Sequence, residues 1–365
     1  MKNIYFRCDT SKIIGSGHVL RCLTIAEKLI DNGYKCFLIT SKSFEENFKI
    51  NFFSSFEILT LPRYDFDPNY DQSRYENSPD YINFEKNDIK NIIALKNKIY
   101  QNSIIVVDHY LLGKQWQNFA GTIFKKVVVI DDLLNTAHSC DLIIDPNIRN
   151  KIGTDKIRKN YKNITLLTGK KYLIIRPSFK KARKRIINAL SIKKKTVDCL
   201  VLFGGSEDNE TIYNIISCII KMRYPIKIHI VMGKNNKNKD QIKKIAEENI
   251  NVKLYSFTKN IEIIMEKCDF AIGALGTTTW ERCYLGLPTL VFVKSYNQLR
   301  FLEDLVFQNI VFDLGKTITT QKILNSFDHI QLFSKDFSKT RINLMNKIDG
   351  KGITRITKEI IKLLS

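Results

Sequence analysis

Short β-branched runs that alternate with amphipathic helical segments constrain the fold of this chain more than any other feature. In the first half, such runs occupy residues 2–9, 35–41, 103–110, 126–132 and 141–147. The second half repeats the arrangement, with apolar runs at residues 198–206, 226–233, 251–257, 270–276 and 289–293. Because short buried runs alternating with helices are typical of parallel sheets covered by helices, we predict an α/β protein.

The length of the chain and one basic stretch set the expected domain organisation. A chain of 365 residues suits two domains, since ordinary domains hold roughly 100–200 residues. We place an N-terminal domain at residues 1–178 and a C-terminal domain at residues 196–365, joined by a basic linker at residues 179–195. Residues 57–88, which are rich in Asp, Asn, Pro and Tyr, are expected to form a long loop or insertion. Two halves built on one plan would leave a crevice between them for a ligand.

Composition excludes several classes of protein. Hydrophobic residues make up 44% of the chain, which rules out wholesale disorder. No apolar run approaches the roughly 18 residues that span a bilayer, and the N-terminal segment turns polar too early for a signal peptide. The eight cysteines form no CxxC pair. We therefore expect a cytoplasmic protein with buried free thiols, no disulfide framework and no metal site.

The net charge of +21 has two interpretations. Such an excess attracts nucleic acids, anionic membrane surfaces or phosphorylated small molecules. Much of it, however, comes from lysines spread along the whole chain, and no nucleic-acid recognition module accompanies them. We therefore favour a solvated, lysine-rich surface and expect neither a nucleic-acid partner nor stable membrane insertion.

The first strand-to-helix turn holds the first candidate site, because ligands of open α/β sheets lie beyond the carboxyl ends of the strands. Gly15 and Gly17 allow close backbone approach there, and His18 opens the following helix. The positive end of the helix dipole disfavours a protonated imidazole, so His18 is a candidate proton acceptor. Capping of its own helix is the alternative role for His18. Asp108 and Tyr110, which follow a later strand, are its candidate partners.

Other polar residues near strand ends have simpler explanations. Asp131 and Asp132 end another apolar run. Helix N-capping by aspartate is common, and it is the role that we expect for Asp132 and consider for Asp131. The remaining histidines share no metal-ligand spacing, so we expect structural roles for His109, His138, His229 and His329.

Two glycine turns in the second half suit phosphate groups. The first strand there ends in Gly204, Gly205 and Ser206, whose backbone amides could hold phosphate oxygens or simply form an ordinary turn.

Residues 273–281 form the strongest local pattern in the chain. An apolar strand there passes through Gly276, Thr277 and Thr278 into a helix, which brings free amides, hydroxyls and a helix dipole together. This combination suits a diphosphate. Glu281 lies near the start of the helix and is a candidate acceptor for a ribose diol. The alternative is a capping box between Thr278 and Glu281.

The order of the motifs identifies a resemblance to a known family. From the N-terminus, the chain contains DTSKIIGSGHVLRCLTIAEKL, VVDHY, VIDDL, LFGGS and AIGALGTTTWERCYLGLPTLVF. With these motifs it resembles the UDP-2,4-diacetamido-2,4,6-trideoxy-β-L-altropyranose hydrolases of bacterial pseudaminic acid biosynthesis, from residue 1 to about residue 300. That family is similar to the GT-B glycosyltransferase that makes lipid II from UDP-N-acetylglucosamine. The resemblance implies two facing Rossmann-like domains, with the active site in the cleft between them and the nucleotide mainly on the C-terminal domain.

The resemblance also implies roles for individual residues. His18 matches the base that activates water, and Tyr110 matches a tyrosine near that base. Glu281 matches the acid expected on the ribose, and Asn297 matches an asparagine expected at the substrate. The turn residues that match phosphate loops are Gly204, Gly205, Ser206, Gly276, Thr277 and Thr278. The run at residues 295–298 departs from the family, where a small residue more often precedes Asn-Gln.

The implied activity is hydrolysis of a UDP-linked 2,4-diacetamido-2,4,6-trideoxy sugar to the free sugar and UDP, for flagellin or surface-glycan glycosylation. Water deprotonated by His18 would attack the anomeric carbon with C–O cleavage and inversion, while helix-start amides hold the departing diphosphate. No cofactor and no metal are expected, and a monomer is favoured. The alternative is a UDP-sugar-dependent GT-B glycosyltransferase acting on a membrane or glycan acceptor. Release of UDP without any acceptor would distinguish the two.

Overall fold

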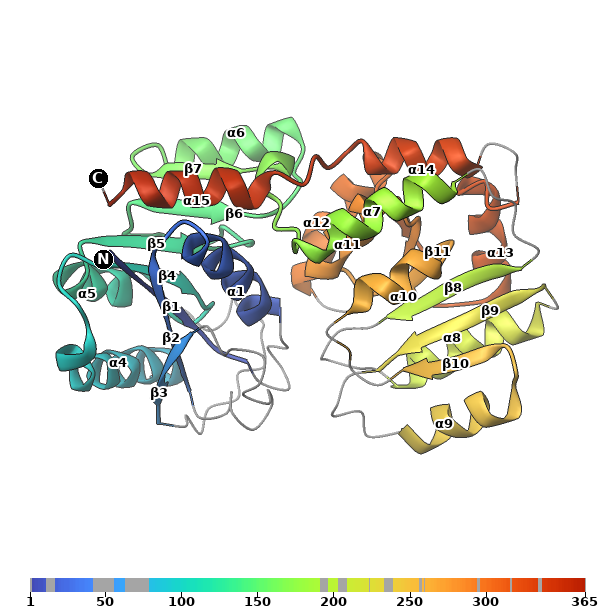
Figure 1. The fold of residues 1–365 in the computed structure, drawn as a ribbon, viewed down its shortest axis with the longest axis horizontal. Coiled ribbons are helices and arrows are strands. Elements are labelled where there is room, and N and C mark those ends of the chain that lie inside the picture. The colour runs from blue at the N-terminus through green and yellow to red at the C-terminus, as the bar shows by residue number, and fades with distance from the viewer. Residues whose placement is uncertain are drawn as a thin grey trace. The chain divides into compact units, whose positions relative to one another are not determined.

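The structure is a computed structural model of the 365-residue chain. It describes residues 2–10, 17–41, 56–62, 79–190, 196–202, 209–222, 224–232, 239–255, 258, 260–293, 296–315, 317–333 and 337–364. The chain divides into two compact units (Figure 1). Unit 1 comprises Met1–Ile174 together with Lys351–Ser365, and unit 2 comprises Ile175–Gly350.

Unit 1 is built on one seven-stranded sheet in which every neighbouring pair of strands is parallel. The order of the strands is β3-β2-β1-β4-β5-β6-β7. Their bounds are β1 Asn3–Cys8, β2 Lys35–Ser41, β3 Glu57–Leu61, β4 Ile104–Asp108, β5 Lys126–Ile130, β6 Leu142–Asp145 and β7 Thr165–Thr168. The strand order reverses direction between β1 and β4, so the carboxyl ends of these two strands form a topological switch point.

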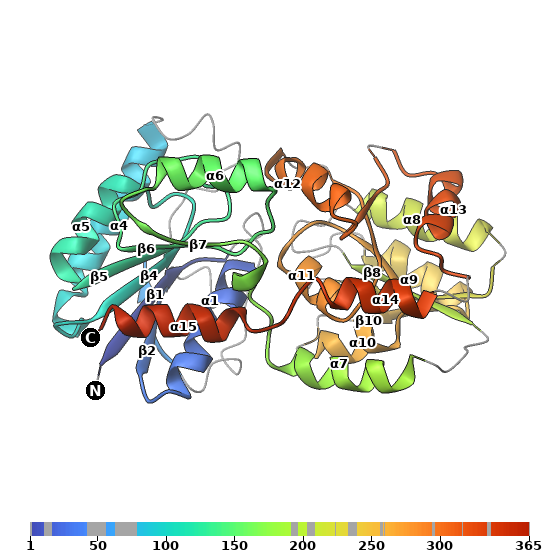
Figure 2. The same ribbon diagram turned by 90° about the horizontal axis from the view of Figure 1, so that it is seen from above.

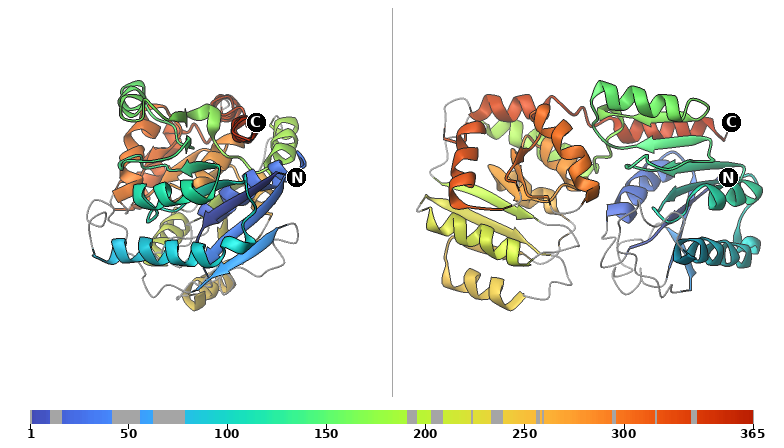
Figure 3. Two further views of the ribbon diagram at one scale, coloured as in Figure 1. Left: turned by 90° about the vertical axis from the view of Figure 1, so that its left-hand side faces the viewer. Right: turned by 180° about the vertical axis from the view of Figure 1, so that it is seen from behind.

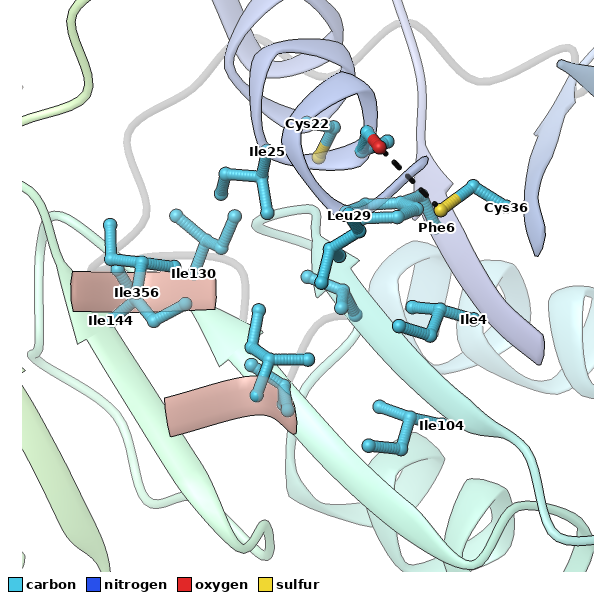
Figure 4. Packing of buried hydrophobic residues seen from close by; sticks show 14 of the residues in the cluster. Ile4, Phe6, Cys22, Ile25, Leu29, Cys36, Ile104, Ile130, Ile144 and Ile356 are labelled. Carbon is cyan, nitrogen blue, oxygen red and sulfur yellow. Dashed lines mark hydrogen bonds between the residues drawn. The ribbon is translucent and has the colours of Figure 1, made fainter. Parts of the chain in front are cut away.

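Helices cover both faces of this sheet. In the described part of unit 1, the helices are α1 Gly17–Ile30, α4 Pro79–Ala94, η2 Lys96–Lys98, α5 Lys114–Ile123, α6 Lys151–Asn160, η3 Lys170–Tyr172 and α15 Gly352–Lys362. α1 and α15 pack on one face, and α4 and α5 pack on the other (Figure 3). The strands supply alternate residues to the two cores: Ile4 and Phe6 join the first, whereas Tyr5 joins the second. Figure 4 shows the first core, with Ile25 and Leu29 of α1 packed near Phe6.

The last helix of the chain, α15, belongs to unit 1. Its Ile353, Ile356 and Ile360 lie on one helical stripe and enter the same core as Val19 and Cys22 of α1. The two helices lie beside each other (Figure 2). The expectation that the C-terminal domain continues to residue 365 is therefore wrong, because the apolar stripe of α15 is buried against unit 1.

Unit 2 repeats the parallel arrangement with a six-stranded sheet. The order of its strands is β10-β9-β8-β11-β12-β13. Their bounds are β8 Val197–Leu202, β9 Ile226–Val231, β10 Val252–Tyr255, β11 Phe270–Gly273, β12 Thr289–Val291 and β13 Phe312–Asp313. The switch point of this sheet lies between β8 and β11, which places the two predicted phosphate turns after neighbouring strands.

The helices of unit 2 enclose a second core. They are α7 Ser178–Ala189, α8 Asn209–Lys221, α9 Lys239–Glu248, α10 Ile261–Lys267, α11 Thr277–Tyr284, α12 Tyr296–Phe307, α13 Thr320–His329 and α14 Phe337–Met345. Ile212 and Ile216 of α8 and Phe327 of α13 pack against buried residues of the strands, such as Val201 and Ile272. Both units thus have the predicted α/β class.

Two sequence-based boundaries differ from the structure. The stretch expected as a linker, residues 179–195, begins inside α7, whose Phe179, Ala182 and Ile186 are buried and which contacts α10 and α11 of unit 2. The expected loop at residues 57–88 opens with β3 and ends inside α4, and residues 63–78 lie outside the described part. In both segments, numerous polar or basic residues made the sequence resemble a linker or loop, although other residues of the same segments are apolar and buried.

The cysteines agree with the prediction from their spacing. All eight are described and free; six are buried, whereas Cys140 and Cys218 are partly exposed. Within the described ranges, no helix combines the length and apolar character needed to cross a membrane.

Candidate active site

His18 and Asp108 meet at the switch point of unit 1. α1 begins at Gly17, so His18 lies in its first turn, and Asp108 is the last residue of β4. His18 Nδ1 lies 2.5 Å from Asp108 Oδ1, and the two side chains are 10% and 0% exposed. Because an ionised carboxylate can only accept, Nδ1 is the nitrogen that carries the proton. The Nε2 lone pair is then left to accept a proton from another group.

Arg21, one turn further along α1, connects Asp108 to a second acidic group. Its Nε donates to Asp108 Oδ2 over 2.5 Å and its Nη2 to Oδ1 over 2.6 Å. Its Nη1 donates to Asp132 Oδ2 over 2.8 Å. The Tyr110 hydroxyl donates to Asp132 Oδ1 over 2.6 Å, and the Tyr110 ring meets His18 edge-on, with centroids 4.7 Å apart. These five side chains form one continuous network.

The charges in this network keep both carboxylates ionised. Burial alone would raise the pKa of Asp108, but the charge of Arg21 and the hydrogen bonds from Arg21 and His18 outweigh burial and hold that pKa well below its ordinary value. Burial also acts on Asp132, where the charge of Arg21 again prevails and lowers the pKa. Burial beside Asp132 raises the pKa of the Tyr110 phenol well above its ordinary value. Asp108 therefore remains an acceptor for His18 at neutral pH, and Tyr110 remains a neutral hydrogen-bond donor.

The expected capping roles of Asp131 and Asp132 are wrong. No helix begins between β5 and α6, so neither residue has a helix to cap. Asp131 instead accepts the amide of Leu133 over 2.8 Å and pairs with His138 Nε2 at 3.0 Å. Asp132 faces Arg21 and Tyr110, as described above. Sequence reasoning missed both Asp132 and Arg21 as site residues. The available signal was the spacing of Arg21, which stands one helical turn after His18.

The loop that carries Asp132 is held by two further side chains that sequence reasoning also missed. Asn147 Nδ2 and Arg149 Nη2 both donate to the Asp132 carbonyl, over 2.9 and 2.7 Å. Arg149 Nε in turn donates to Asp145 Oδ2 over 2.7 Å, at the end of β6. Burial raises the pKa of Asp145 to about 6 in spite of the Arg149 charge. The ends of β4, β5 and β6 thus support one polar surface.

Other histidines lie outside this network and have their own acidic partners. His109 Nε2 lies 3.3 Å from Asp9 Oδ2, and His229 Nε2 lies 2.7 Å from Asp198 Oδ1. Among the residues whose placement is described, no group of three or more His, Cys, Asp or Glu side chains is arranged to hold a metal ion.

The start of α11 is the second candidate site, in unit 2. Gly276 precedes the helix and is exposed, whereas Thr277 and Thr278 in the first turn are half-buried. The first amides of a helix have no acceptor within it, so they can bind an anion. The alternative of a capping box between Thr278 and Glu281 is not what the structure shows. Thr279 closes the helix start instead, because its Oγ1 accepts the Gly276 amide over 3.0 Å and its own amide donates to the Gly276 carbonyl over 2.9 Å.

Glu281 is held by an arginine rather than by its own helix start. Arg176 Nε donates to Glu281 Oε1 over 2.6 Å and Arg176 Nη2 to Oε2 over 2.8 Å. The Arg176 guanidinium also lies over the ring of Phe179, 4.9 Å from its centroid. A carboxylate has about four lone-pair sites, so this pair fixes the orientation of Glu281 and still leaves acceptor capacity for a hydroxyl.

The remaining predicted site residues fall wholly or partly outside the described residues. Of the first turn, the structure describes Gly17, the first residue of α1, but not Gly15. It describes the backbone of Asn297, the second residue of α12, but not its side chain. The turn after β8 lies outside the described part with Gly204, Gly205 and Ser206.

Comparison with known sequences gives distant relatives. An uncharacterized protein of Methanocaldococcus jannaschii is 21% identical over 81% of this chain, which spans 56% of that protein. The spore coat polysaccharide biosynthesis protein SpsG of Bacillus subtilis is 25% identical over 53% of this chain, which spans 58% of that protein. The UDP-2,4-diacetamido-2,4,6-trideoxy-β-L-altropyranose hydrolase of Campylobacter jejuni is 22% identical over 80% of this chain and 92% of the hydrolase. The last match confirms the resemblance drawn from the motifs.

Comparison with solved structures identifies the fold. MurG of Acinetobacter baumannii superposes with a TM-score of 0.63 at 13% identity, covering 99% of this chain and 100% of MurG. The UDP-GlcNAc 2-epimerase of Neisseria meningitidis gives a TM-score of 0.64 at 15% identity, with 99% and 100% coverage. Residues 199–343 match the glycosyltransferase family 28 C-terminal domain. The chain therefore has the α/β fold of the GT-B glycosyltransferases, and the matched family segment lies within unit 2.

Proposed function

We propose that this protein processes UDP-sugars, and specifically that it hydrolyses a UDP-linked 2,4-diacetamido-2,4,6-trideoxy sugar to the free sugar and UDP. The similarity to the Campylobacter jejuni hydrolase, which extends over 80% of this chain, supports this substrate class. The observation that carries the proposal is the His18–Asp108 pair, with 2.5 Å between Nδ1 and Oδ1 at the switch point of unit 1. In the proposed pathway, the free sugar is a precursor of pseudaminic acid for surface glycans.

In this mechanism His18 is the general base. Its Nε2 accepts a proton from water, and the resulting hydroxide attacks the anomeric carbon from the face opposite the diphosphate, with inversion. Asp108 holds the imidazole in the tautomer that leaves Nε2 free, and it stabilises the imidazolium once the proton has been transferred. A positioned base of this kind is worth about 10²–10⁴-fold in rate.

Arg21 is a positioning residue for this pair. Two of its nitrogens donate hydrogen bonds to the two oxygens of Asp108, at 2.5 and 2.6 Å, and these bonds restrain the carboxylate from rotating away from His18. Its charge keeps the pKa of Asp108 low, so the proton taken up by His18 stays on the imidazole. Tyr110, fixed by Asp132, presents its ring edge-on to His18 and limits the directions in which the imidazole can turn.

We propose that unit 2 binds the UDP moiety. The amides and hydroxyls at Gly276, Thr277 and Thr278 suit the diphosphate, whose departing oxygen gains negative charge as the C–O bond breaks. Glu281 accepts hydrogen bonds from the ribose diol, in the orientation that Arg176 imposes. The match of residues 199–343 to the family 28 C-terminal domain supports a nucleotide-sugar role for this unit.

A UDP-sugar-dependent glycosyltransferase is the second candidate. It is favoured by the same family match and by the likeness in fold to MurG. The two candidates differ in whether UDP release requires an acceptor. A panel of UDP-amino sugars, incubated with the protein alone, separates them: the hydrolase releases UDP and an inverted free sugar, which NMR identifies, whereas a transferase leaves the donors intact.

His18→Asn tests the mechanism directly. We expect kcat to fall about 10²-fold or more, because the base acts only in the chemical step. Binding of UDP should stay within twofold of the native value. His229→Asn is the matched control, since His229 is a buried histidine paired with Asp198 in unit 2. Near-normal turnover of folded His18→Asn would show that the base is another residue.

A further inference from the structure

Arg282, a residue of α11, is hydrogen-bonded to the loop that leads into this helix. Its Nη2 donates to the Ala274 carbonyl over 2.8 Å and to Thr279 Oγ1 over 3.0 Å. Its Nε points to the Thr278 carbonyl at 3.4 Å. The side chain is completely buried. One guanidinium therefore holds both ends of the segment between β11 and the first turn of α11.

The third nitrogen of this guanidinium, Nη1, is buried and makes no hydrogen bond to any residue that the structure describes. It lies beside Gly273, where a Cβ atom would stand 2.9 Å from Nη1 and 2.1 Å from the Leu202 carbonyl oxygen. Gly273 and Leu202 are paired at the carboxyl ends of β11 and β8. The free nitrogen thus faces the switch point of unit 2, where only a glycine leaves room for it.

Arg282 also differs from the other buried arginines in its ion pairing, since the charge of the neighbouring Glu281 offsets the cost of its burial only in part. The other buried arginines Arg7, Arg21 and Arg341 each have a carboxylate within 4.0 Å. Among the residues that the structure describes, Arg282 has none. Its sequence neighbour Glu281 is occupied by Arg176 through both oxygens. A buried charge without a partner is costly, so proteins retain one where an external group compensates it.

We propose that Arg282 is the buried cation of a diphosphate-binding site formed by the end of β11 and the start of α11, an inference that rests on the proposed function. The helix amides bind the phosphate oxygens from the solvent side. Arg282 supplies a full positive charge from the protein interior. It also holds the loop from Ala274 to Thr279 in the conformation that exposes those amides to the ligand. Arg176 contributes by pairing with Glu281, which weakens the repulsion between that carboxylate and the anion.

The protonation of Arg282 is consistent with this role. Burial lowers its pKa to about 10, which still leaves the side chain charged at neutral pH. A bound anion would restore that pKa toward its ordinary value, because it stabilises the charged form. Arg282 acts on the ligand through its charge and through the loop, so it is a positioning residue.

The test compares ligands that differ only in their phosphates. Dissociation constants for UDP, UMP, uridine and inorganic pyrophosphate are measured by titration calorimetry, or by ligand-detected NMR for the weak binders. We expect Arg282→Gln to weaken UDP and pyrophosphate by roughly 10- to 100-fold, the range for losing one charge-assisted interaction, and to leave uridine within twofold. Arg282→Lys, which retains the charge, should recover most of the UDP-to-uridine affinity ratio. Arg341→Gln, at a buried arginine paired with Asp269, is the control.

The outcomes separate the inference from the proposed function. Equal binding of UDP and pyrophosphate by the native protein and Arg282→Gln would overturn the inference, and so would an equal loss for uridine and UDP. Arg282-dependent pyrophosphate binding without turnover of any UDP-sugar would support the anion site and refute the proposed function. If circular dichroism shows that Arg282→Gln does not fold, Arg282→Lys becomes the deciding variant. A native UDP-to-uridine affinity ratio in this variant would support the role of the charge in anion binding, and a ratio near one would refute it.

Discussion

Replacing Asp108 by asparagine should remove the proposed base function of His18 while the shape of the site is nearly conserved. Asp108 accepts one hydrogen bond from His18 Nδ1 and two from Arg21, at 2.5 to 2.6 Å. Asparagine has one oxygen, so its amide group must face either His18 or Arg21. An amide that faces His18 donates to Nδ1 and moves the imidazole proton to Nε2. The tautomer that can accept a proton from water is then lost.

The size of the effect follows from these contacts. We expect kcat of Asp108→Asn to fall about 10²–10⁴-fold, which is the usual contribution of a positioned base. Breaking a buried ion pair costs about 3–5 kcal/mol of folding free energy. Arg21 keeps Asp132 as a partner at 2.8 Å, so a value near the lower end is expected. The UDP dissociation constant should not change, because UDP is proposed to bind to unit 2 and Asp108 belongs to unit 1.

Three measurements check this prediction: steady-state UDP release for kcat and KM, calorimetry for UDP binding, and thermal unfolding for stability. Asp198→Asn is the matched control, since Asp198 also pairs with a buried histidine, at 2.7 Å from His229 Nε2 in unit 2. It should lose stability but keep kcat. A folded Asp108→Asn protein with kcat within about threefold of native would refute the tautomer argument, given the range expected for a general base.

Further predictions concern unit 2 and the glycines. Glu281→Ala should raise the UDP dissociation constant about tenfold in calorimetry. The control Glu266→Ala, which removes the partner of an exposed arginine, should leave this constant unchanged. An unchanged constant for Glu281→Ala would show that this carboxylate has a purely structural role. Gly286→Ala should lower the free energy of unfolding by about 2–4 kcal/mol, because φ is +64° and the new Cβ would lie 2.6 Å from the Arg341 carbonyl oxygen. Gly33→Ala, where φ is +84° and the new Cβ would have no atom within 4 Å, should lower the free energy of unfolding by less. Equal decreases for the two variants in chemical denaturation would contradict the argument that the close contact at Gly286 adds to the effect.

Most strands were predictable because each is a short, largely buried apolar run, whereas β3, β7 and β13, which are only partly buried, were not predicted. Residues 103–110 and 126–132, for example, contain β4 and β5 with every residue of β4 buried. His18 and Asp108 could be proposed as partners for a topological reason: both lie at the carboxyl ends of strands, and in a parallel sheet these ends share one edge. Their approach to hydrogen-bond distance required β1 and β4 to be neighbours, and the sequence alone does not specify that order.

The other members of the site were harder to predict because their partners are distant in sequence. Arg21 lies within an amphipathic helix, where an arginine is ordinarily solvated, and its two carboxylates are 87 and 111 residues away. In the sequence, Asp132 has the position of a helix cap after a strand. The structure shows that the next element after β5 is the strand β6, not a helix. Arg176 reaches Glu281 across 105 residues. Local propensity carries no information about such long-range pairs.

The placement of α15 has a consequence for the order in which the protein is made. Unit 1 is composed of the first 174 residues and the segment from residue 351 onward, whereas unit 2 is one continuous stretch of chain between them. During vectorial synthesis on the ribosome, unit 2 can therefore emerge complete while unit 1 still lacks its closing helix. Until then, the core face of α1 opposite α15 stays uncovered, and α1 is the helix that carries His18 and Arg21. Unit 1, which holds the proposed base His18, should therefore complete its core only after all of unit 2 has been synthesised.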